Sequence, residues 1–384
     1  MREGWTYKKL GEICEIERGG SPRPIQQYIT DDEDGLNWIK IGDAVDGSKY
    51  INSTKEKIIK EGLKKTRFVH KGDFILSNSM SFGKPYILGI DGCIHDGWLV
   101  IRDTHNHFDK SFLYYLLGSP NMYNEFKRLA VGGVVNNLNS QLVRNVSVAL
   151  PPLSEQQRIV SELDLLSGII EKKKAQLKEY DQLAQSIFYD MFGDPVSNEK
   201  GWEVKNMGDI GTIVAGSTPS TNDESNWDGY VNWVTPAELG EQLYYGETAR
   251  KLTDKGAKGL TMMPVGTVLL SSRAPIGKLA ITTVPMCCNQ GFKNIICNNT
   301  INNVFLYYYL KNTMDLVQAL GRGATFKEVS KSAISSYKII LPPLSLQQPF
   351  ASKIEAIERQ KALVQQSITE AETLFNSRMD YYFN

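Results

Sequence analysis

The sequence predicts an α+β protein in which two similar globular domains are each followed by a long helix. Two observations carry this prediction. The segment Leu-Pro-Pro-Leu-Ser-x-Gln-Gln occurs twice, once from Leu150 and again 191 residues later from Leu341. Each copy is followed by apolar residues in steps of three and four, the heptad spacing of a helix with one narrow packing seam. A repeat of this length is far longer than a solenoid repeat, so it indicates duplicated domains.

The two predicted helices each carry one apolar seam, and each seam is broken by a lysine, at Lys173 and at Lys361. Ordinary core packing also produces such stripes, but the length and the duplication favour two helices that pair as an antiparallel coiled coil. The seam positions that we expect to form the helical spacer and the docking face for other subunits are Leu163, Leu166, Ile170, Leu177 and Ile187 in the first helix, and Ile354, Ile357, Val364, Ile368 and Phe375 in the second.

The helix starts carry their own signals. Ser154 with Gln157 predicts a capping box, and Ser345 with Gln348 repeats it. Pro349 stands just past the first turn and lacks the N–H that a helix uses there, so the second helix is expected to begin late.

The domain boundaries follow from the order of these segments. Gly193 with Pro195 close behind ends the first helix. The short linker after it brings the second domain near that end, so a second helix that packs on the first must run back along it. The expected parts are a first domain at 1–149, a helix at 150–192, a linker at 193–200, a second domain at 201–340 and a helix at 341–384.

The duplication continues inside the globular domains, where each copy mixes short strand-like runs with one clear helix. The long polar loops at 19–34 and 216–229 are equally compatible with recognition and with solvated connections. The matching segments are 20–22 with 216–219, 37–39 with 232–234, 72–77 with 266–271, 83–84 with 277–278 and 112–115 with 305–308, and the predicted helices cover about 110–117 and 304–311.

Composition excludes several classes. The chain has 384 residues, 41% of them hydrophobic, with 43 basic and 43 acidic side chains, so no overall field draws it to nucleic acid or to a membrane surface, although local basic patches are not excluded. No run of about 18 apolar residues predicts a membrane span. The five cysteines are scattered, which is typical of buried, reduced thiols in a cytoplasmic protein.

Catalytic signatures are not found in the sequence. It contains no G-x-x-x-x-G-K-[ST] phosphate loop, no G-x-S-x-G turn and no Asn-Pro-Pro-aromatic run of the amino-methyltransferase kind. His105 and His107 form an H-x-H pair without nearby cysteine, so an exposed polar turn is favoured over zinc. We therefore expect no catalytic residues, no metal and no enzyme activity in the chain alone.

Local clusters of basic and polar residues favour double-stranded DNA as a partner. Basic residues gather before the strand-like run in both copies, which suits phosphate neutralisation but is also compatible with a solvated face. The residues after that run differ between the copies, and Arg273 has the fork geometry that takes guanine in bidentate fashion. The candidate DNA-binding residues are Arg23, Lys64, Lys65, Arg67, Ser77, Asn78, Ser79, Lys84, Ser271, Ser272, Arg273 and Lys278.

With these motifs in place, the chain resembles the specificity subunit of type I restriction–modification systems along essentially its whole length. The resemblance rests on the LPPL-S-E-Q-Q-R-I-V helix start, the linker MFGDPVSNEKGW at 191–202 and the segment GRGATFKEVSKS at 321–332. The first copy departs from the last of these, reading GGVVNNLNSQ at 132–141. Arg158 and Ile159 also become Pro349 and Phe350 in the second copy.

The resemblance implies a non-catalytic reader that binds no cofactor itself. Each globular domain would be a target recognition domain for one half of a bipartite, asymmetric DNA site. The helices would set the gap between the halves and dock two methyltransferase (M) subunits, which use S-adenosylmethionine to methylate adenine. Restriction (R) subunits that use ATP and Mg would join this core. From the residues alone, a coiled-coil scaffold without DNA specificity stays open, whereas the missing cofactor motifs argue against a self-contained methyltransferase or nuclease.

Overall fold

The computed structural model describes residues 4–45, 47–78, 83–130, 138–273, 275–322 and 327–384. It divides into two compact units. Unit 1 comprises Met1–Lys172 and Ile368–Asn384, and unit 2 comprises Lys173–Ser367. Within the described ranges, no helix combines the length and the apolar character needed to cross a membrane.

Unit 1 holds a globular domain built on two five-stranded sheets, ordered β2-β11-β8-β9-β5 and β3-β6-β4-β10-β7, with a two-stranded sheet of β1 and β12. Its elements are β1 (Thr6–Lys9), α1 (Leu10–Ile13), β2 (Glu15–Arg18), β3 (Ile29–Thr30), β4 (Leu36–Ile39), β5 (Tyr50–Ile51), β6 (Glu56–Ile58), β7 (Arg67–Val69), β8 (Phe74–Ser77), β9 (Pro85–Leu88), β10 (Gly92–Ile94), β11 (Trp98–Arg102), α2 (Lys110–Gly118), α3 (Pro120–Ala130), α4 (Ser140–Arg144) and β12 (Ser147–Leu150).

Unit 2 repeats this plan, with a five-stranded sheet ordered β14-β21-β18-β19-β16, a smaller sheet ordered β17-β15-β20 and the pair β13-β22. Its elements are β13 (Glu203–Asn206), α6 (Met207–Ile210), β14 (Gly211–Ala215), β15 (Trp227–Val234), β16 (Tyr244–Tyr245), β17 (Arg250–Leu252), α7 (Asp254–Ala257), β18 (Val268–Ser272), β19 (Ile276–Thr282), β20 (Cys287–Cys288), β21 (Lys293–Cys297), α8 (Asn303–Asn312), α9 (Met314–Ala319), α10 (Lys331–Ser335) and β22 (Lys338–Leu341). The predicted tandem repeat is therefore confirmed at the level of sheet order.

Each domain is organised on a central strand that is buried on both faces. Every residue of β8 and of β18 is buried, as expected for a short apolar run between turns. The neighbouring helices α2 and α8 begin where predicted. Their first turns are capped by the side chains of Asp109 and Asn302, each of which accepts two backbone N–H groups.

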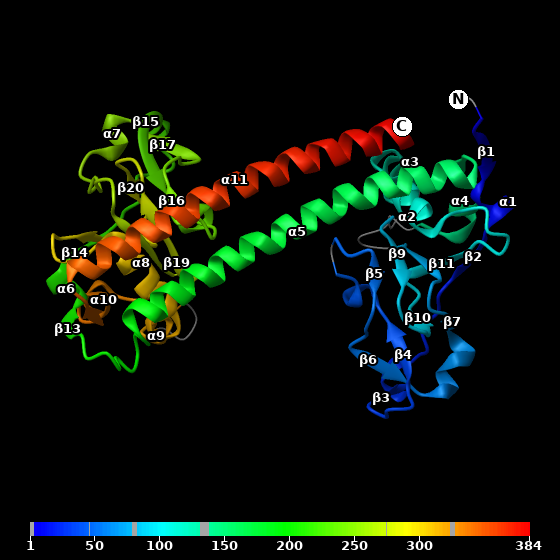
Figure 1. Cartoon of the computed structure of the whole chain (residues 1–384), viewed down its shortest axis with the longest axis horizontal. Coiled ribbons are helices and arrows are strands. Elements are labelled where there is room, and N and C mark those ends of the chain that lie inside the picture. Colours follow the sequence, from blue (N-terminus) through cyan, green and yellow to red (C-terminus); the bar gives the residue numbers. More distant parts are fainter. Residues whose placement is uncertain (1–3, 46, 79–82, 131–137, 274, 323–326) are drawn as a thin grey trace. The chain divides into compact units, whose positions relative to one another are not determined.

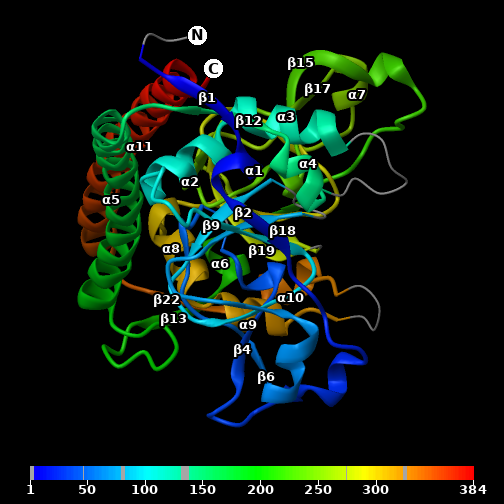
Figure 2. The same cartoon turned by 90° about the vertical axis from the view of Figure 1, so that its right-hand side faces the viewer.

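The long helices are α5 (Leu153–Phe192) and α11 (Leu344–Phe383), and they pair in both units. In unit 1 the start of α5 packs on the end of α11, with Leu163 and Met379 in one buried cluster. In unit 2 the end of α5 packs on the start of α11, where Phe188 and Phe350 lie 5.7 Å apart by ring centroid. The two helices run side by side and antiparallel in each unit, as the seams predict (Figure 1, Figure 2).

The predicted seam residues are used inside the chain. Six of them are buried, Leu163, Leu166, Ile354, Ile357, Val364 and Ile368, and four are half-buried, Ile170, Leu177, Ile187 and Phe375. The six buried side chains are not accessible to another subunit, so their assignment as a docking face is corrected, and a docking face must use exposed positions.

Lys361, which interrupts the second seam, forms ion pairs inside the helical pair. The Lys361 ammonium, 19% exposed, lies 2.8 Å from Asp181 on α5 and 3.0 Å from Glu358 on its own helix. Burial by itself would lower the pKa of Lys361, but the hydrogen bonds to the two carboxylates outweigh it, so the pKa is raised. A paired charge inside an apolar seam fixes the register of the two helices.

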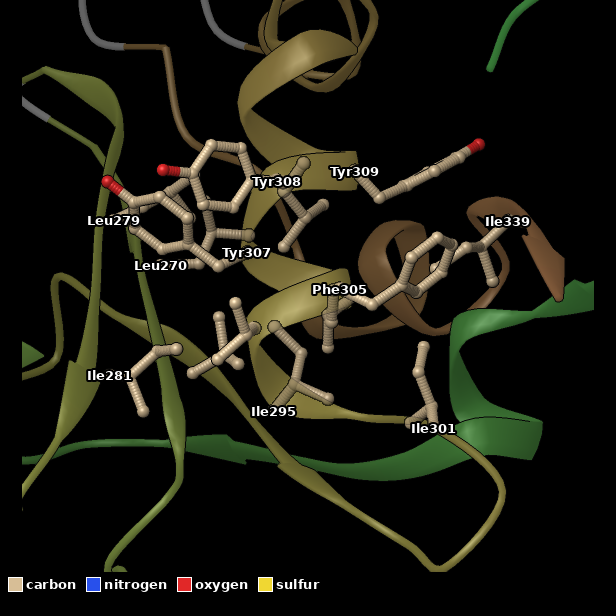
Figure 3. Close-up of a cluster of buried hydrophobic side chains, with 14 of the residues drawn as sticks. Leu270, Leu279, Ile281, Ile295, Ile301, Phe305, Tyr307, Tyr308, Tyr309 and Ile339 are labelled. Atoms are coloured by element: carbon tan, nitrogen blue, oxygen red, sulfur yellow. The ribbon is translucent and has the colours of Figure 1, made fainter. Parts of the chain in front are cut away.

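An aromatic and aliphatic core joins the helices of unit 2 to its domain. Figure 3 shows α8 presenting Phe305 and the run 307–309 among aliphatic side chains that include Leu270, Leu279 and Ile295. Phe305 then stacks on Phe188 of α5 with ring centroids 5.8 Å apart. One continuous core therefore links the sheet, α8 and the helical pair within this unit.

The structure corrects two expectations about the helix starts. Both helices begin at the leucine before the predicted capping serine, so Ser154 and Ser345 lie inside the first turn and the capping boxes do not form. Pro349 does not delay the second helix either, because α11 begins at Leu344 and includes it. The proline removes only the bond to the carbonyl of exposed Ser345, which water can satisfy.

The first glutamine of each repeated motif has a different role, which the sequence pattern did not indicate. Gln156 and Gln347 are completely buried. The Gln156 amide donates to the carbonyl of Pro151 and accepts from the backbone N–H of Asp109. Gln347 does the same with Pro342 and Asn302. Each glutamine therefore ties the start of a long helix to the cap of the helix that covers the domain's sheet.

Candidate nucleic-acid interface

The turn after the central strand contains one equivalent hydrogen bond in both domains. Ser77 accepts the backbone N–H of Lys84 at 2.9 Å, and Ser271 accepts that of Lys278 at 2.8 Å. Both serines are buried, at 1% and 0% exposure. Their hydroxyls therefore hold the turn together and do not face DNA, which corrects the sequence-based assignment of Ser77 and Ser271.

The next predicted residues are also enclosed. Asn78 is fully buried, and its amide donates to the carbonyl of Asp96 at 2.9 Å. Ser272 is 1% exposed and lies 3.3 Å from the ammonium of Lys293, which forms an ion pair with Glu328 at 3.1 Å. Asn78 and Ser272 are thus structural, for the same reason as the serines before them. Ser79 lies outside the described residues.

The predicted basic residues of the first domain differ in how far they are engaged. The Arg23 side chain is 84% exposed and 3.9 Å from Asp96. Lys64 is exposed, whereas Lys65 donates to the hydroxyl of Tyr28 at 2.8 Å. Arg67 pairs with Glu17 at 3.3 Å. Arg23 and Lys64 are therefore the first-domain cations best placed to meet phosphate or base edges.

In the second domain the basic candidates also divide. Arg273 is half-buried, and its backbone forms an isolated bridge with Glu328. The ammonium of Lys278 donates to the carbonyl of Pro236 at 2.9 Å, while Lys84, its counterpart in the repeat, is half-buried. Arg273 therefore stays the second-domain candidate for a base contact.

The sequence indicated the polar loops 19–34 and 216–229 but not the turns against which they pack. In the first domain the loop after β2 lies against the turn between β10 and β11. A Cβ on Gly19 would come within 2.3 Å of the carbonyl oxygen of His95. In the second domain a Cβ on Gly216 would come within 2.1 Å of that of Asn289. The two glycines permit this close approach. Gly216 opens the matched segment 216–219, and Gly19 directly precedes the segment 20–22 that matches it.

The histidine pair shows no metal geometry. His107 Nδ1 lies 3.0 Å from a carboxylate oxygen of Asp103, and the rings of His105 and His107 meet edge to face. Across the described ranges, no group of three or more His, Cys, Asp or Glu side chains is placed to hold a metal ion.

Comparisons with known proteins agree with this duplicated arrangement. The chain matches the family described as Type I restriction modification DNA specificity domain over residues 2–179 and again over 199–373. It is 27% identical to the putative type I restriction enzyme MjaX specificity subunit of Methanocaldococcus jannaschii, over 93% of this chain and 87% of that protein. It is 40% identical to the MjaIX specificity subunit of the same organism, over 40% of this chain but only 37% of that protein.

A solved structure shares the fold. A chain described under complex assembly and conformational transition of the type I R-M system superposes with a TM-score of 0.62 at 21% identity, covering 100% of this chain and 98% of that one. The two matched segments span most of the sequence and coincide with the two repeats. The chain therefore belongs to the type I restriction–modification specificity subunits and carries two DNA specificity domains in tandem.

Proposed function

We propose that each globular domain reads one half of a split, asymmetric DNA target. The observation that carries this proposal is the pair of equivalent turns, which share one serine-to-backbone hydrogen bond but differ in sequence. Ser77 and Ser271 hold the two turns in the same way. The residues that follow read Asn-Ser-Met-Ser in one copy and Ser-Arg-Ala-Pro in the other. One scaffold that carries two different turn sequences suits two different half-sites.

The contacts to DNA would use two exposed cations of the first domain and one half-buried cation of the second. Arg23 and Lys64 in the first domain and Arg273 in the second are proposed to meet the duplex, with Arg273 reading a guanine. Lys65 and Arg67 would add to the positive potential, although each already has a partner in the chain. The buried polar residues would stabilise the turns without touching DNA; these are Ser77, Asn78, Ser271 and Ser272.

The helical pair is proposed to set the gap between the half-sites and to dock two methyltransferase subunits. Leu183 on α5 and Leu374 on α11 occupy equivalent positions in the repeat. Each side chain is 47% exposed, although other apolar side chains of the same helix are buried. One belongs to unit 2 and the other to unit 1. Two equivalent apolar positions match the requirement of two identical partner subunits.

The chemistry would belong to the partners. S-adenosylmethionine would be used by the methyltransferase subunits, and ATP with Mg by the restriction subunits, because the sequence carries no phosphate loop and no methyltransferase motif. The chain itself would be non-catalytic and would act in the cytoplasm, where the chromosome is accessible. The family match favours this role over a coiled-coil scaffold without DNA specificity.

Two experiments test these proposals. The chain is co-expressed with the methyltransferase subunit of its own system in a host that lacks adenine methylation, and methylated adenines are mapped across the genome. A single split motif with a fixed gap supports the proposal, and a soluble complex that methylates no defined motif would overturn it.

The docking proposal is tested with Leu183→Asp and Leu374→Asp. Each variant is expected to lose one of two bound methyltransferase subunits, as measured by the mass of the complex, while the exposed Leu363→Asp change on α11 serves as the control. Full assembly by both variants would refute the docking positions.

A further inference from the structure

One pair of polar side chains occupies the same place in both domains and differs in chemistry. Asp96 stands in the turn between β10 and β11, and Gln290 stands in the turn between β20 and β21. Ser21 donates to Asp96 Oδ1 at 2.8 Å. Thr218 donates to Gln290 Oε1. Each pair thus joins the loop after the first sheet strand to the turn opposite it.

The backbone shows that these positions are equivalent. The N–H of Gly20 donates to the carbonyl of Ile94, and the N–H of Ser217 donates to that of Cys288. On the other side, the glycine after Asp96 accepts the N–H of Asn78 at 2.9 Å, and the glycine after Gln290 accepts that of Ser272 at 2.8 Å. The same frame therefore holds a carboxylate in one domain and a carboxamide in the other.

Both side chains are oriented but still reach the surface. Asp96 keeps 30% side-chain exposure, and its Oδ1 is engaged by Ser21 and by His95 Nε2 at 3.0 Å. Its Oδ2 is directed towards the exposed Arg23, 3.9 Å away. Gln290 is exposed, and its bond from Thr218 uses the amide oxygen and leaves Nε2 out of that contact. In each domain one side-chain atom, Asp96 Oδ1 or Gln290 Oε1, is fixed by a hydrogen bond, and the second polar atom of the same side chain is left for a ligand.

An oriented carboxylate has a specific use beside the cation Arg23. Because a carboxylate repels phosphate, it weakens non-specific binding to DNA. It contributes favourably to the binding free energy only where a base edge offers a hydrogen-bond donor. In the major groove that donor is the exocyclic amine, and carboxylates accept from cytosine N4. A glutamine amide instead donates and accepts together, which matches the N7 and N6 edge of adenine.

We infer that Asp96 and Gln290 are the equivalent base-reading positions of the two domains, with Asp96 selecting a cytosine and Gln290 selecting an adenine. Ser21 and Thr218 are positioning residues that act through them. This inference rests on the proposed function, since it assigns side chains to the two half-sites that the domains are proposed to read.

The test compares methylated motifs for the assembled wild-type complex and three variants. Asp96→Asn is expected to lose discrimination about 5- to 150-fold at one base pair of one half-site and to leave the other half-site unchanged. Ser21→Ala should relax the same base pair by a smaller factor. Gln290→Glu, on an exposed residue that cannot disturb the core, should shift one base pair of the opposite half-site from adenine towards cytosine.

The possible outcomes distinguish failure of the proposed function from failure of the base-reading assignment. A wild-type complex that yields no split motif overturns the proposed function and this inference with it. A normal wild-type motif that stays unchanged in Gln290→Glu and in Asp96→Asn overturns the inference alone. A uniform loss of methylation at every position, with the base preferences intact, would show that Asp96 only supports the turn and would also contradict the inference.

Discussion

Replacing Phe188 with alanine tests how the helical pair is fixed to the second domain. Phe188 is completely buried, and its ring centroid lies 5.8 Å from Phe305 of α8 and 5.7 Å from Phe350 of α11. Truncating a fully buried phenylalanine removes its transfer free energy and leaves a cavity, which together cost about 3–5 kcal/mol. Because three separate helices line this cavity, we expect little relaxation and a loss towards the upper end of that range.

Hydrogen exchange as a function of urea measures this loss within unit 2 alone. With a urea dependence of about 2 kcal/mol per molar, the midpoint for peptides of α8 should fall by about 2–2.5 M. Leu363→Ala provides the control, since Leu363 is 58% exposed on α11 and its truncation should change stability by about 0.5 kcal/mol or less. Equal shifts for Phe188→Ala and Leu363→Ala would refute the role of this core in joining helix and domain.

Three further predictions concern DNA binding and the thiols. Arg273→Ala should relax one base preference in one half-site by about 1–3 kcal/mol, measured as competition between single-base variants of the target. Replacing Lys64 and Lys65 with glutamine should weaken binding to all sequences alike and reduce the slope of log affinity against log salt by about one for each phosphate that is no longer neutralised. Burial raises the pKa of the Cys93 thiol to about 11 and that of Cys14 to about 12. The native chain should therefore resist alkylation at pH 8, and its stability should fall as pH rises above about 9, where only the unfolded chain ionises; rapid native labelling of Cys93 would contradict this.

The long helices and the repeat could be predicted because their signals are local and strong. Heptad spacing fixes which face of a helix is apolar, and two such faces in one chain need a partner. The antiparallel pairing followed from the short linker after the first helix. Gly193 has a positive φ of 75° and ends α5, as its position in the sequence predicted. The equivalent strand order of the two domains was implied by the matched segments but not by any single one of them.

The exposed surface could not be predicted in the same way. Polar residues after a buried strand can face a ligand or their own turn, and only tertiary packing decides between these. Ser77 and Ser271 face their turns, whereas Arg23 remains open. Asp96 and Gln290 gave no sequence signal, because a carboxylate and a carboxamide do not align as a motif until the backbone frame around them is known.

The capping serines illustrate a related limit. The pattern Ser-x-x-Gln fits a capping box, but the buried Gln156 and Gln347 bind the preceding loop and let each helix begin one residue earlier. A long-range contact between the helix start and the cap of α2 or α8 outweighs the local preference. Such contacts join segments more than forty positions apart in the chain, where sequence spacing carries no information.

Each domain is proposed to specify its own half of the target. In a domain-exchange experiment the second domain is replaced with a copy of the first, joined where β13 and β22 correspond to β1 and β12. The methylated motif of the resulting complex is then compared with that of the wild type. Both halves of the methylated motif are expected to become the half-site of the first domain. A motif that keeps the wild-type second half would contradict this proposal.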